Sequence, residues 1–432
     1  MRFRNLSVVL IGVGLAVVVP GLLPATVAGS YPSGDNPVPD TPAAIALFQE
    51  RTDGDPNPIN LTLLAQLHAR RSRETGDVNE LTRAEAALNQ ALAHQPNYGP
   101  AVLTLAAVQA AQHRFEEALA TARLAQELDP RLGALAVVGD VLVATGDYQG
   151  AASAYSELAS SGGSPGLRAR VAHLDELSGG IESAILQTEQ AAADHLEAGG
   201  VGEEAAWFQV RLGDLNYSIG NLREADRRYE ASTELLPGYW SALAGRAKVS
   251  AARGDFDHAI ELYEEAATAV PRPEIMVALG DLYTITGQLD LASDSYATVE
   301  AIAQLSPGVY DRNLALYQAE NGQAADALVI ARKGLEERQD IYGYDTLAWT
   351  LYHLDRFAEA REAMDQAMSL GTRDAFLYFH SGAIWLALGD QARAATDLAV
   401  ALDLNRNFHP LHAEEAAQML DEASARTRKA SI

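Results

Sequence analysis

One stretch of the chain, residues 212–237, reads LGDLNYSIGNLREADRRYEASTELLP. Its central Ala225 follows a glycine turn at Gly220 and precedes Tyr229 by four residues. Alanines in the same setting recur at intervals of 33 to 35 residues, with one interval of 41; they are Ala84, Ala118, Ala151, Ala184, Ala225, Ala259, Ala292, Ala327, Ala360 and Ala394. A repeat of this length indicates a chain built from identical supersecondary units that bury their apolar faces by stacking.

The residues around each alanine predict two helices joined by a tight turn. Two apolar stretches of helical periodicity flank a glycine, which supplies the positive backbone dihedral that ends the first helix. The alanine is needed because a larger side chain would hold the two helices apart. A tyrosine four residues later lies on the same face of the second helix and is expected to fill the gap toward the next unit. Residues 138–155, 254–271 and 279–296 carry the same pattern.

This pattern resembles the tetratricopeptide repeat, a helix-turn-helix unit of about 34 residues whose small residues pack its two helices. The resemblance covers residues 59–408. It implies an all-α fold, an α-α superhelix in which a right-handed solenoid of about ten helical hairpins ends in a C-terminal capping helix. The lack of alternating β-branched runs in the sequence agrees with an all-helical chain.

Four segments are predicted along the chain. Residues 1–28 are a signal peptide or a signal anchor, and residues 29–58 are a disordered leader rich in Pro, Gly and Asp. Residues 59–408 are the repeat array, and residues 409–432 are the C-terminal capping helix and tail.

The N-terminal segment predicts export. A basic start, 1–4, precedes the uncharged run 6–23 and the small residues of 26–30, which is the pattern of a cleaved signal. The alternative is an uncleaved membrane anchor formed by residues 6–23, whose length approaches the ~20 residues that cross a bilayer. The chain has no cysteine, which excludes disulfides and a lipidated cysteine anchor. The predicted location is therefore secreted, periplasmic or at the cell surface.

The net charge of the chain limits the kinds of partner that it is expected to bind. The formal net charge is -26, and a field of this sign repels phosphate backbones, so no nucleic-acid partner is expected. Some proteins of the family clamp an acidic C-terminal tail with several basic residues of neighbouring first helices. Here Arg211, Lys248 and Arg312 are each isolated among acidic residues, so capture of an acidic tail is not expected.

The resemblance places a binding groove on the concave face, which the first helix of each hairpin lines. Registering the units on their alanines puts Asp140, Asp214 and Asp281 at equivalent positions. Aromatic or amphipathic residues are expected at other lining positions: Trp207, Tyr217, Trp349, Tyr352, His353, Phe376, Phe379 and His380. We expect this groove to bind a protein or peptide with basic and apolar side chains. The alternative is that the carboxylates only solvate helices and half of the aromatic residues belong to the core between repeats.

Catalytic and metal-binding patterns are weak in this sequence. His409 and His412, near Glu414 and Glu415, offer two metal-ligand types, but Pro410 separates the histidines and spacing ties no third ligand to them. The sequence has no phosphate-binding glycine loop with lysine, no Gly-x-Ser-x-Gly elbow and no thiol. We therefore expect no enzymatic activity, no cofactor and no metal site.

Together these features predict a non-enzymatic, exported scaffold that binds proteins or peptides through its concave groove, in the assembly of a cell-envelope complex. The alternative function is an accessory protein that collects a metal ion or a small cationic ligand for a transporter or an enzyme complex. The sequence leaves the oligomeric state open.

Overall fold

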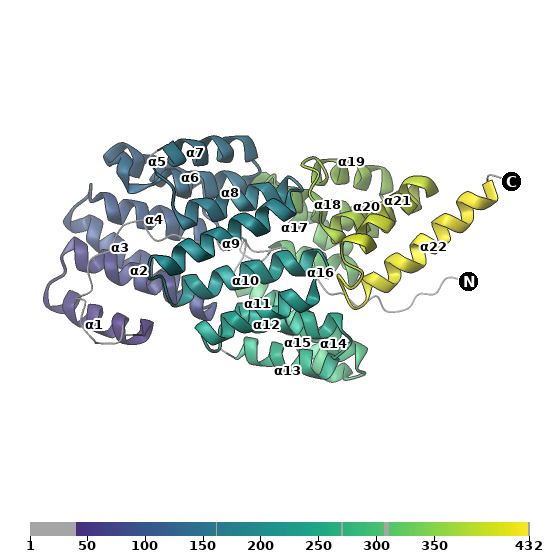
Figure 1. Ribbon diagram of the computed structural model, residues 1–432, viewed down its shortest axis with the longest axis horizontal. Coiled ribbons are helices and arrows are strands. Elements are labelled where there is room, and N and C mark those ends of the chain that lie inside the picture. The colour runs from purple at the N-terminus through teal and green to yellow at the C-terminus, as the bar shows by residue number, and fades with distance from the viewer. Residues whose placement is uncertain (1–39, 161, 269–270, 306–310, 431–432) are drawn as a thin grey trace. The chain divides into compact units, whose positions relative to one another are not determined.

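The computed structural model describes residues 40–160, 162–268, 271–305 and 311–430, and within these residues every regular element is a helix (Figure 1). The expected all-α fold is confirmed. The predicted signal segment and the first part of the leader lie outside the described residues. By its internal contacts the chain divides into two compact units. The first unit holds residues 40–171 and 190–205, and the second unit holds residues 172–189 and 206–430.

The helices of the first unit begin in the segment that the sequence predicts as a disordered leader. Residues 41–54 form helix α1 instead, because Asp40 caps its N-terminus and the Thr41 hydroxyl donates to Glu74 of the next helix, 2.6 Å away. The prediction for 29–58 is wrong over this range. The other helices that lie wholly in this unit are α2 (Pro58–Thr75), α3 (Asn79–His94), α4 (Gly99–Ala111), α5 (Phe115–Leu128), η1 (Pro130–Leu132), α6 (Leu135–Thr145) and α7 (Tyr148–Ser160).

Three helices contribute to both units, and the rest belong to the second unit. The shared helices are α8 (Pro165–Leu177), α9 (Ile181–Glu197) and α10 (Glu203–Ser218). The second unit continues with α11 (Leu222–Leu235), α12 (Trp240–Ala252), α13 (Phe256–Ala267), α14 (Pro273–Ile285), α15 (Leu289–Leu305) and α16 (Asp311–Glu320). It ends with α17 (Ala324–Glu337), α18 (Ile341–His353), α19 (Phe357–Ala367), α20 (Ala375–Leu388), α21 (Gln391–Leu404) and α22 (His412–Ala430).

The repeated alanines occupy the second helix of each hairpin, as the sequence predicts. Each is buried: Ala292 is 4% exposed and the other nine are 0% exposed. The turn before the second helix takes a left-handed residue, such as Gly146 or Gly220. His113 and Asp355 adopt the same backbone region in the two hairpins that lack glycine there.

A glycine, an aspartate and a tyrosine form a recurring contact between the helices of a hairpin. A Cβ on Gly213 would lie 2.5 Å from the Tyr229 ring, so only glycine leaves room for it. The Tyr229 hydroxyl donates to the neighbouring Asp214 at 2.7 Å. The same arrangement joins Gly139, Asp140 and Tyr155, and Gly280, Asp281 and Tyr296. The prediction that the tyrosine reaches the next unit is confirmed for Tyr229, which lies against Gly245, and for Tyr296, which stacks on Tyr317.

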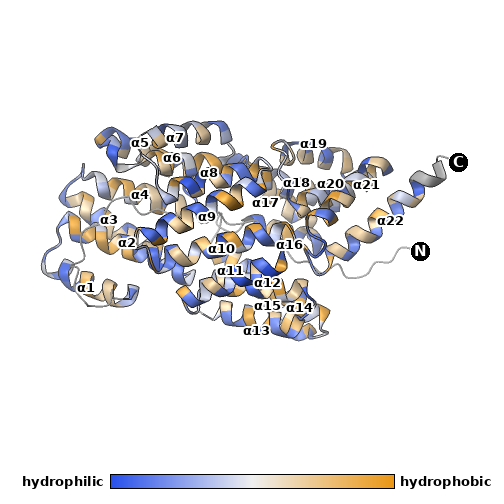
Figure 2. Ribbon diagram, in the orientation of Figure 1, coloured by the Kyte–Doolittle hydropathy of each residue, from blue (hydrophilic) through white to orange (hydrophobic). Residues whose placement is uncertain are grey.

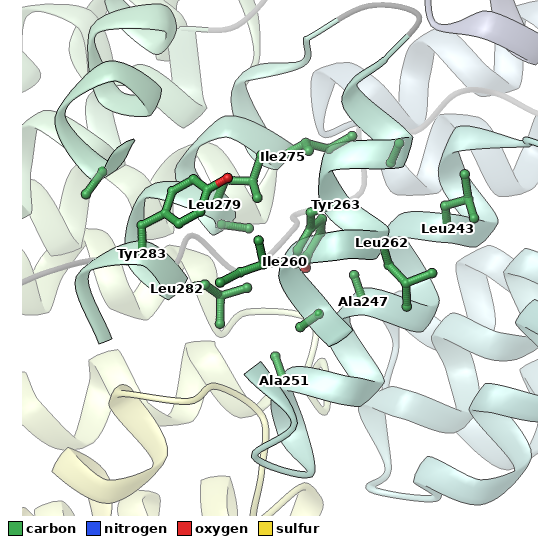
Figure 3. Packing of buried hydrophobic residues seen from close by; sticks show 14 residues of the cluster. Leu243, Ala247, Ala251, Ile260, Leu262, Tyr263, Ile275, Leu279, Leu282 and Tyr283 are labelled. Atoms are coloured by element: carbon green, nitrogen blue, oxygen red, sulfur yellow. The ribbon is translucent and has the colours of Figure 1, made fainter. Parts of the chain in front are cut away.

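The core consists of small clusters between successive helices. Figure 2 shows hydrophobic and hydrophilic residues along the same helices, as expected when each helix turns one face to its neighbours. In the cluster of Figure 3, Leu243 of α12, Ile260 and Tyr263 of α13 and Leu282 of α14 are all buried. Stability is therefore spread along each unit as contacts between adjacent helices.

Candidate binding cavity of the second unit

The two ends of the hairpin series in the second unit contact each other. Thr372, before α20, donates to the carbonyl of Leu177 at the end of α8. Asn405, after α21, donates to the carbonyl of Tyr217 in α10 at 2.7 Å. The Tyr217 hydroxyl in turn lies 3.3 Å from the Phe408 carbonyl. These contacts join residues about 190 positions apart and close the second unit around its interior.

This closure is expected to depend on Asn405. Replacing it with alanine removes a bond that bridges the two ends, and we expect a loss of about 1–2 kcal/mol in unfolding free energy. Hydrogen exchange should rise both near Leu177 and near Phe408. The matched control is Asn321→Ala, because Asn321 donates to the Tyr317 carbonyl at 2.8 Å within its own helix end. Equal effects of the two variants on exchange near Leu177 would contradict a closing role for Asn405.

The second unit surrounds a cavity of about 170 Å³, more than ten times the ~10–15 Å³ that one water molecule needs. Most of its lining comes from the first helix of successive hairpins, from α8 to α20, and the rest from Tyr263 of α13 and the segment between α21 and α22. The charged lining residues are Glu176, Asp214, Lys248, Arg312, Asp345 and Asp374. The aromatic lining residues are Tyr217, Tyr263, Tyr342, Phe376, His380, Phe408 and His409.

Each cation at the cavity already has a carboxylate partner. The Lys248 ammonium lies 3.6 Å from Asp214 and 5.2 Å from the centre of the Tyr217 ring. The Arg312 guanidinium contacts both oxygens of Asp340, at 2.8 and 2.7 Å. These pairs restrict both cations and reduce their capacity to attract an anion.

Glu176 is also balanced by a cation, which lies behind the cavity wall. Arg211 forms a salt bridge with this carboxylate, and His173 lies 2.8 Å from it. Burial by itself raises the pKa of Glu176, but the Arg211 charge and the bonds from both partners outweigh it and bring that pKa down to about 2.

Another part of the cavity wall, formed by α18 and the start of α20, is acidic. Asp345 of α18 lies 2.7 Å from the Nδ1 atom of His380 in α20. Asp374 caps the N-terminus of α20, where its carboxylate accepts the backbone N–H of Phe376 at 2.8 Å. Burial raises the pKa of Asp374 to about 6, and the nearby Asp345 charge acts in the same direction. Desolvation and like charge thus disfavour the ionised form of Asp374.

The cavity brings together four residues that the sequence places in a groove, namely Asp214, Tyr217, Phe376 and His380. The prediction is wrong for Asp140 and Asp281, which the structure buries inside hairpins. In the first unit Asp140 accepts the Tyr155 hydroxyl at 2.7 Å and also pairs with Arg170 at 2.8 Å. Asp281, 0% exposed, accepts the Tyr296 hydroxyl. A buried phenol requires an acceptor, and aspartate at this register provides it.

Most of the predicted groove aromatics are core residues. Trp349 and Phe379 are 2% and 0% exposed and pack in the cluster beneath α22. Tyr352 stacks on Trp349 with ring centres 4.7 Å apart, and His353 contacts it edge-on at 4.9 Å. Trp207 lies against Phe208 in α10, with ring centres 5.1 Å apart. Trp349, Tyr352 and Phe379 therefore help to pack α18, α20 and α22 together.

The sequence analysis used Lys248 only to exclude an acidic tail and did not predict that Tyr263 lines the cavity, although a signal was present. In the hairpins with aspartate at the register position, a tyrosine follows 15 residues later and bonds to it. In one hairpin the register position holds Lys248 instead of aspartate, 15 residues before Tyr263. This hairpin therefore lacks the aspartate–tyrosine pair, and both side chains line the cavity. Asp345 and Asp374 gave no such signal, because they lie outside the repeat register.

Among the described residues, no three side chains of His, Asp or Glu lie together as ligands for a metal ion. His412 instead pairs with Glu320 and Glu415, at 3.5 and 3.0 Å. None of the helices that the structure describes is long and apolar enough to cross a membrane.

Comparison with known proteins finds repeat proteins. Yeast Tom70 has 13% identity over 90% of this chain and 93% of its own, with a TM-score of 0.36. A tetratricopeptide repeat protein from Parabacteroides merdae has 18% identity over 62% of this chain and 98% of its own, with a TM-score of 0.36. Human IFIT1 has 14% identity over 73% of both chains, with a TM-score of 0.49.

No curated protein matches this chain. Residues 59–178 match the family model described as a tetratricopeptide repeat-like domain. Residues 59–178 are therefore similar to a tetratricopeptide repeat-like domain, and they lie within a series of helical hairpins that share one alanine register.

Proposed function

We propose that this protein is a non-enzymatic scaffold for protein binding, and that the cavity of the second unit holds a segment of the partner. The observation that carries the proposal is the cavity itself. Successive first helices supply its wall, which combines aromatic side chains with a few carboxylates. Concave sites with apolar walls and a few convergent polar groups are the usual form of binding sites in proteins.

We also propose that the protein acts outside the cytoplasm, in the assembly of a cell-envelope complex. The support for this location is the sequence of residues 1–28, with its basic start, uncharged run and small residues. The acidic net charge further favours partners with exposed basic surfaces over nucleic acids.

The test is a variant that fills the cavity. Asn313 of α16 lines the cavity and is partly exposed, so Asn313→Trp should occupy the space without disturbing the hairpin core. Affinity capture from envelope and cytoplasmic fractions, followed by mass spectrometry, should show a partner that the wild type retains from the envelope fraction and the variant loses.

The matched control is Ala325→Trp, which places the same bulky residue on an exposed position of α17 in the same hairpin. It should retain the partner as the wild type does. Circular dichroism and thermal unfolding check that both variants are folded. Equal retention by Asn313→Trp would rule out the cavity as the binding site, and a partner found only in the cytoplasmic fraction would contradict the proposed location.

A further inference from the structure

We propose that the cavity binds a protonated amine or guanidinium group carried on an apolar chain, namely a lysine or arginine side chain of the partner segment. This inference rests on the proposed function and specifies its chemistry. It follows from the charges at the cavity, from the aromatic side chains in its wall, and from the two carboxylates, Asp345 and Asp374, that no lysine or arginine of the cavity pairs with.

The charges at the cavity do not balance. Four carboxylates line it, against the two cations Lys248 and Arg312. Asp214 is held by Lys248, and Glu176 by Arg211 behind the wall, while Arg312 is engaged by Asp340 behind the wall. The acidic part of the wall thus consists of Asp345 and Asp374, and His380 of α20 lies 2.7 Å from Asp345.

An anionic ligand fits this arrangement poorly. It would have to displace Asp340 from its two-oxygen contact with Arg312, or Asp214 from Lys248. It would also meet the field of Asp345 and Asp374. Replacing a charge-assisted pair by another anion gains little, and placing like charges close together costs free energy.

A cation meets the opposite conditions. Burial, together with the charge of Asp345, penalises the ionised carboxylate of Asp374, and a cation beside this carboxylate relieves both effects. The aromatic side chains of Phe376, Tyr342 and Tyr263 line the cavity and offer apolar surface to an alkyl chain. The cavity volume of about 170 Å³ accommodates one such side chain with ordered water.

The probes are small ions that mimic the two side chains. Isothermal titration of the full chain in phosphate buffer, which contains no competing amine, uses butylammonium and butylguanidinium chloride. Both should bind with dissociation constants on the order of millimolar, as expected for fragments of this size. 1-Butanol has the same apolar chain and sodium butyrate has an alkyl chain one carbon shorter, and both should bind at least about tenfold more weakly. Equal affinity for butyrate would overturn the proposal.

The variant that tests the acidic wall is Asp374→Asn. Asparagine removes the charge but still caps α20, so the helix should be retained. We expect butylammonium affinity to fall about five- to tenfold. The control is Asp390→Asn, which makes the same change at the cap of α21, where Asp390 accepts the Arg393 N–H at 3.1 Å and does not line the cavity. An unchanged affinity in Asp374→Asn would overturn the assignment.

A peptide distinguishes a partner side chain from a free small cation. N-acetyl-Leu-Arg-Leu-amide should bind at least about tenfold more tightly than butylguanidinium, because its neighbouring groups add contacts at the cavity mouth. Equal affinity of peptide and ion would overturn the assignment to a partner side chain and indicate a free amine as the ligand.

The titrations test whether the cavity binds a cation, and the capture experiment tests whether the cavity holds the partner. Each result can be negative without the other. If Asn313→Trp loses the partner while butylammonium does not bind wild-type protein, the proposed function stands and this inference is rejected. If butylammonium binds and the partner is retained by Asn313→Trp, the cavity is a site for a free cation, and both the proposed function and the assignment to a partner side chain are rejected.

Discussion

Replacing Tyr229 with alanine is expected to lower the free energy of unfolding by about 3–5 kcal/mol, the range for removing a large buried aromatic side chain. Tyr229 is 0% exposed, and its ring lies between Gly213 of its own hairpin and Gly245 of the next one. Burial, followed by the Asp214 charge, raises the pKa of Tyr229 well above its ordinary value, so its hydroxyl remains a donor to Asp214. Chemical denaturation of the full chain measures the loss.

Two further variants separate the ring from the hydroxyl. Tyr229→Phe keeps the ring and removes only the bond to Asp214, so it should cost about 1.5–3 kcal/mol. Gly213→Ala places a methyl group against the ring and should cost about 1–3 kcal/mol. The double variant Gly213→Ala with Tyr229→Ala should be less destabilised than the sum of the single changes, by about 0.5–3 kcal/mol. Strict additivity would contradict the close approach of ring and glycine.

The repeat register is the part of the structure that the sequence predicts well. A buried alanine such as Ala225, a turn glycine such as Gly220 and an aromatic residue four positions after the alanine all depend on contacts within one hairpin or with the next. Local spacing is enough to identify such contacts, and their repetition makes chance agreement small. Helix α1 was not predicted. The surrounding sequence is rich in proline and glycine, which indicates disorder, and the capping residue Asp40 was a weaker signal for a helix.

The site was predicted less well, for two physical reasons. The register shows that Asp281 lies on a first helix, but not that the Tyr296 phenol on the second helix needs it as an acceptor. The closure of the second unit depends on Thr372 and Asn405, which contact residues about 190 positions earlier. Hydrophobic periodicity does not report contacts of that range, so the cavity and its acidic wall at Asp374 could not be derived.

Helix α22 also belongs to the closed end of the second unit. It packs on the cluster of α18 and α20 next to the cavity. Its first residue, His412, lies 3.5 Å from Glu320 and 3.0 Å from Glu415. Glu320 also accepts the indole N–H of Trp349. Both His412 and Glu320 are nearly excluded from solvent, with side chains 7% and 5% exposed. The start of α22 is therefore fixed by a buried ion pair.

Removing one member of this pair is expected to release α22. In His412→Ala the Glu320 carboxylate stays buried without its cation, and breaking a buried pair in this way costs about 3–5 kcal/mol. Thermal unfolding and hydrogen exchange over residues 413–426 measure the effect. The control is His258→Ala in α13, whose partner Glu261 lies at 3.5 Å in an exposed pair. An exposed pair of this kind contributes at most about 1 kcal/mol, so α22 should be unaffected.

The dependence on pH provides a second, independent test of this pair. Burial opposes a charge on His412, but Glu320 and Glu415 outweigh it and raise its pKa from 6.5 to about 10. A group whose pKa is raised in the folded state contributes stability that is fully present below about pH 6.5 and is lost as the pH rises through about 10. The stability difference between wild type and His412→Gln should therefore shrink across this range. Facing the pair, His353 has its pKa lowered chiefly by burial, so it does not supply a competing cation near neutral pH. A difference that stays constant from pH 6.5 to pH 10 would show that His412 holds α22 by packing alone.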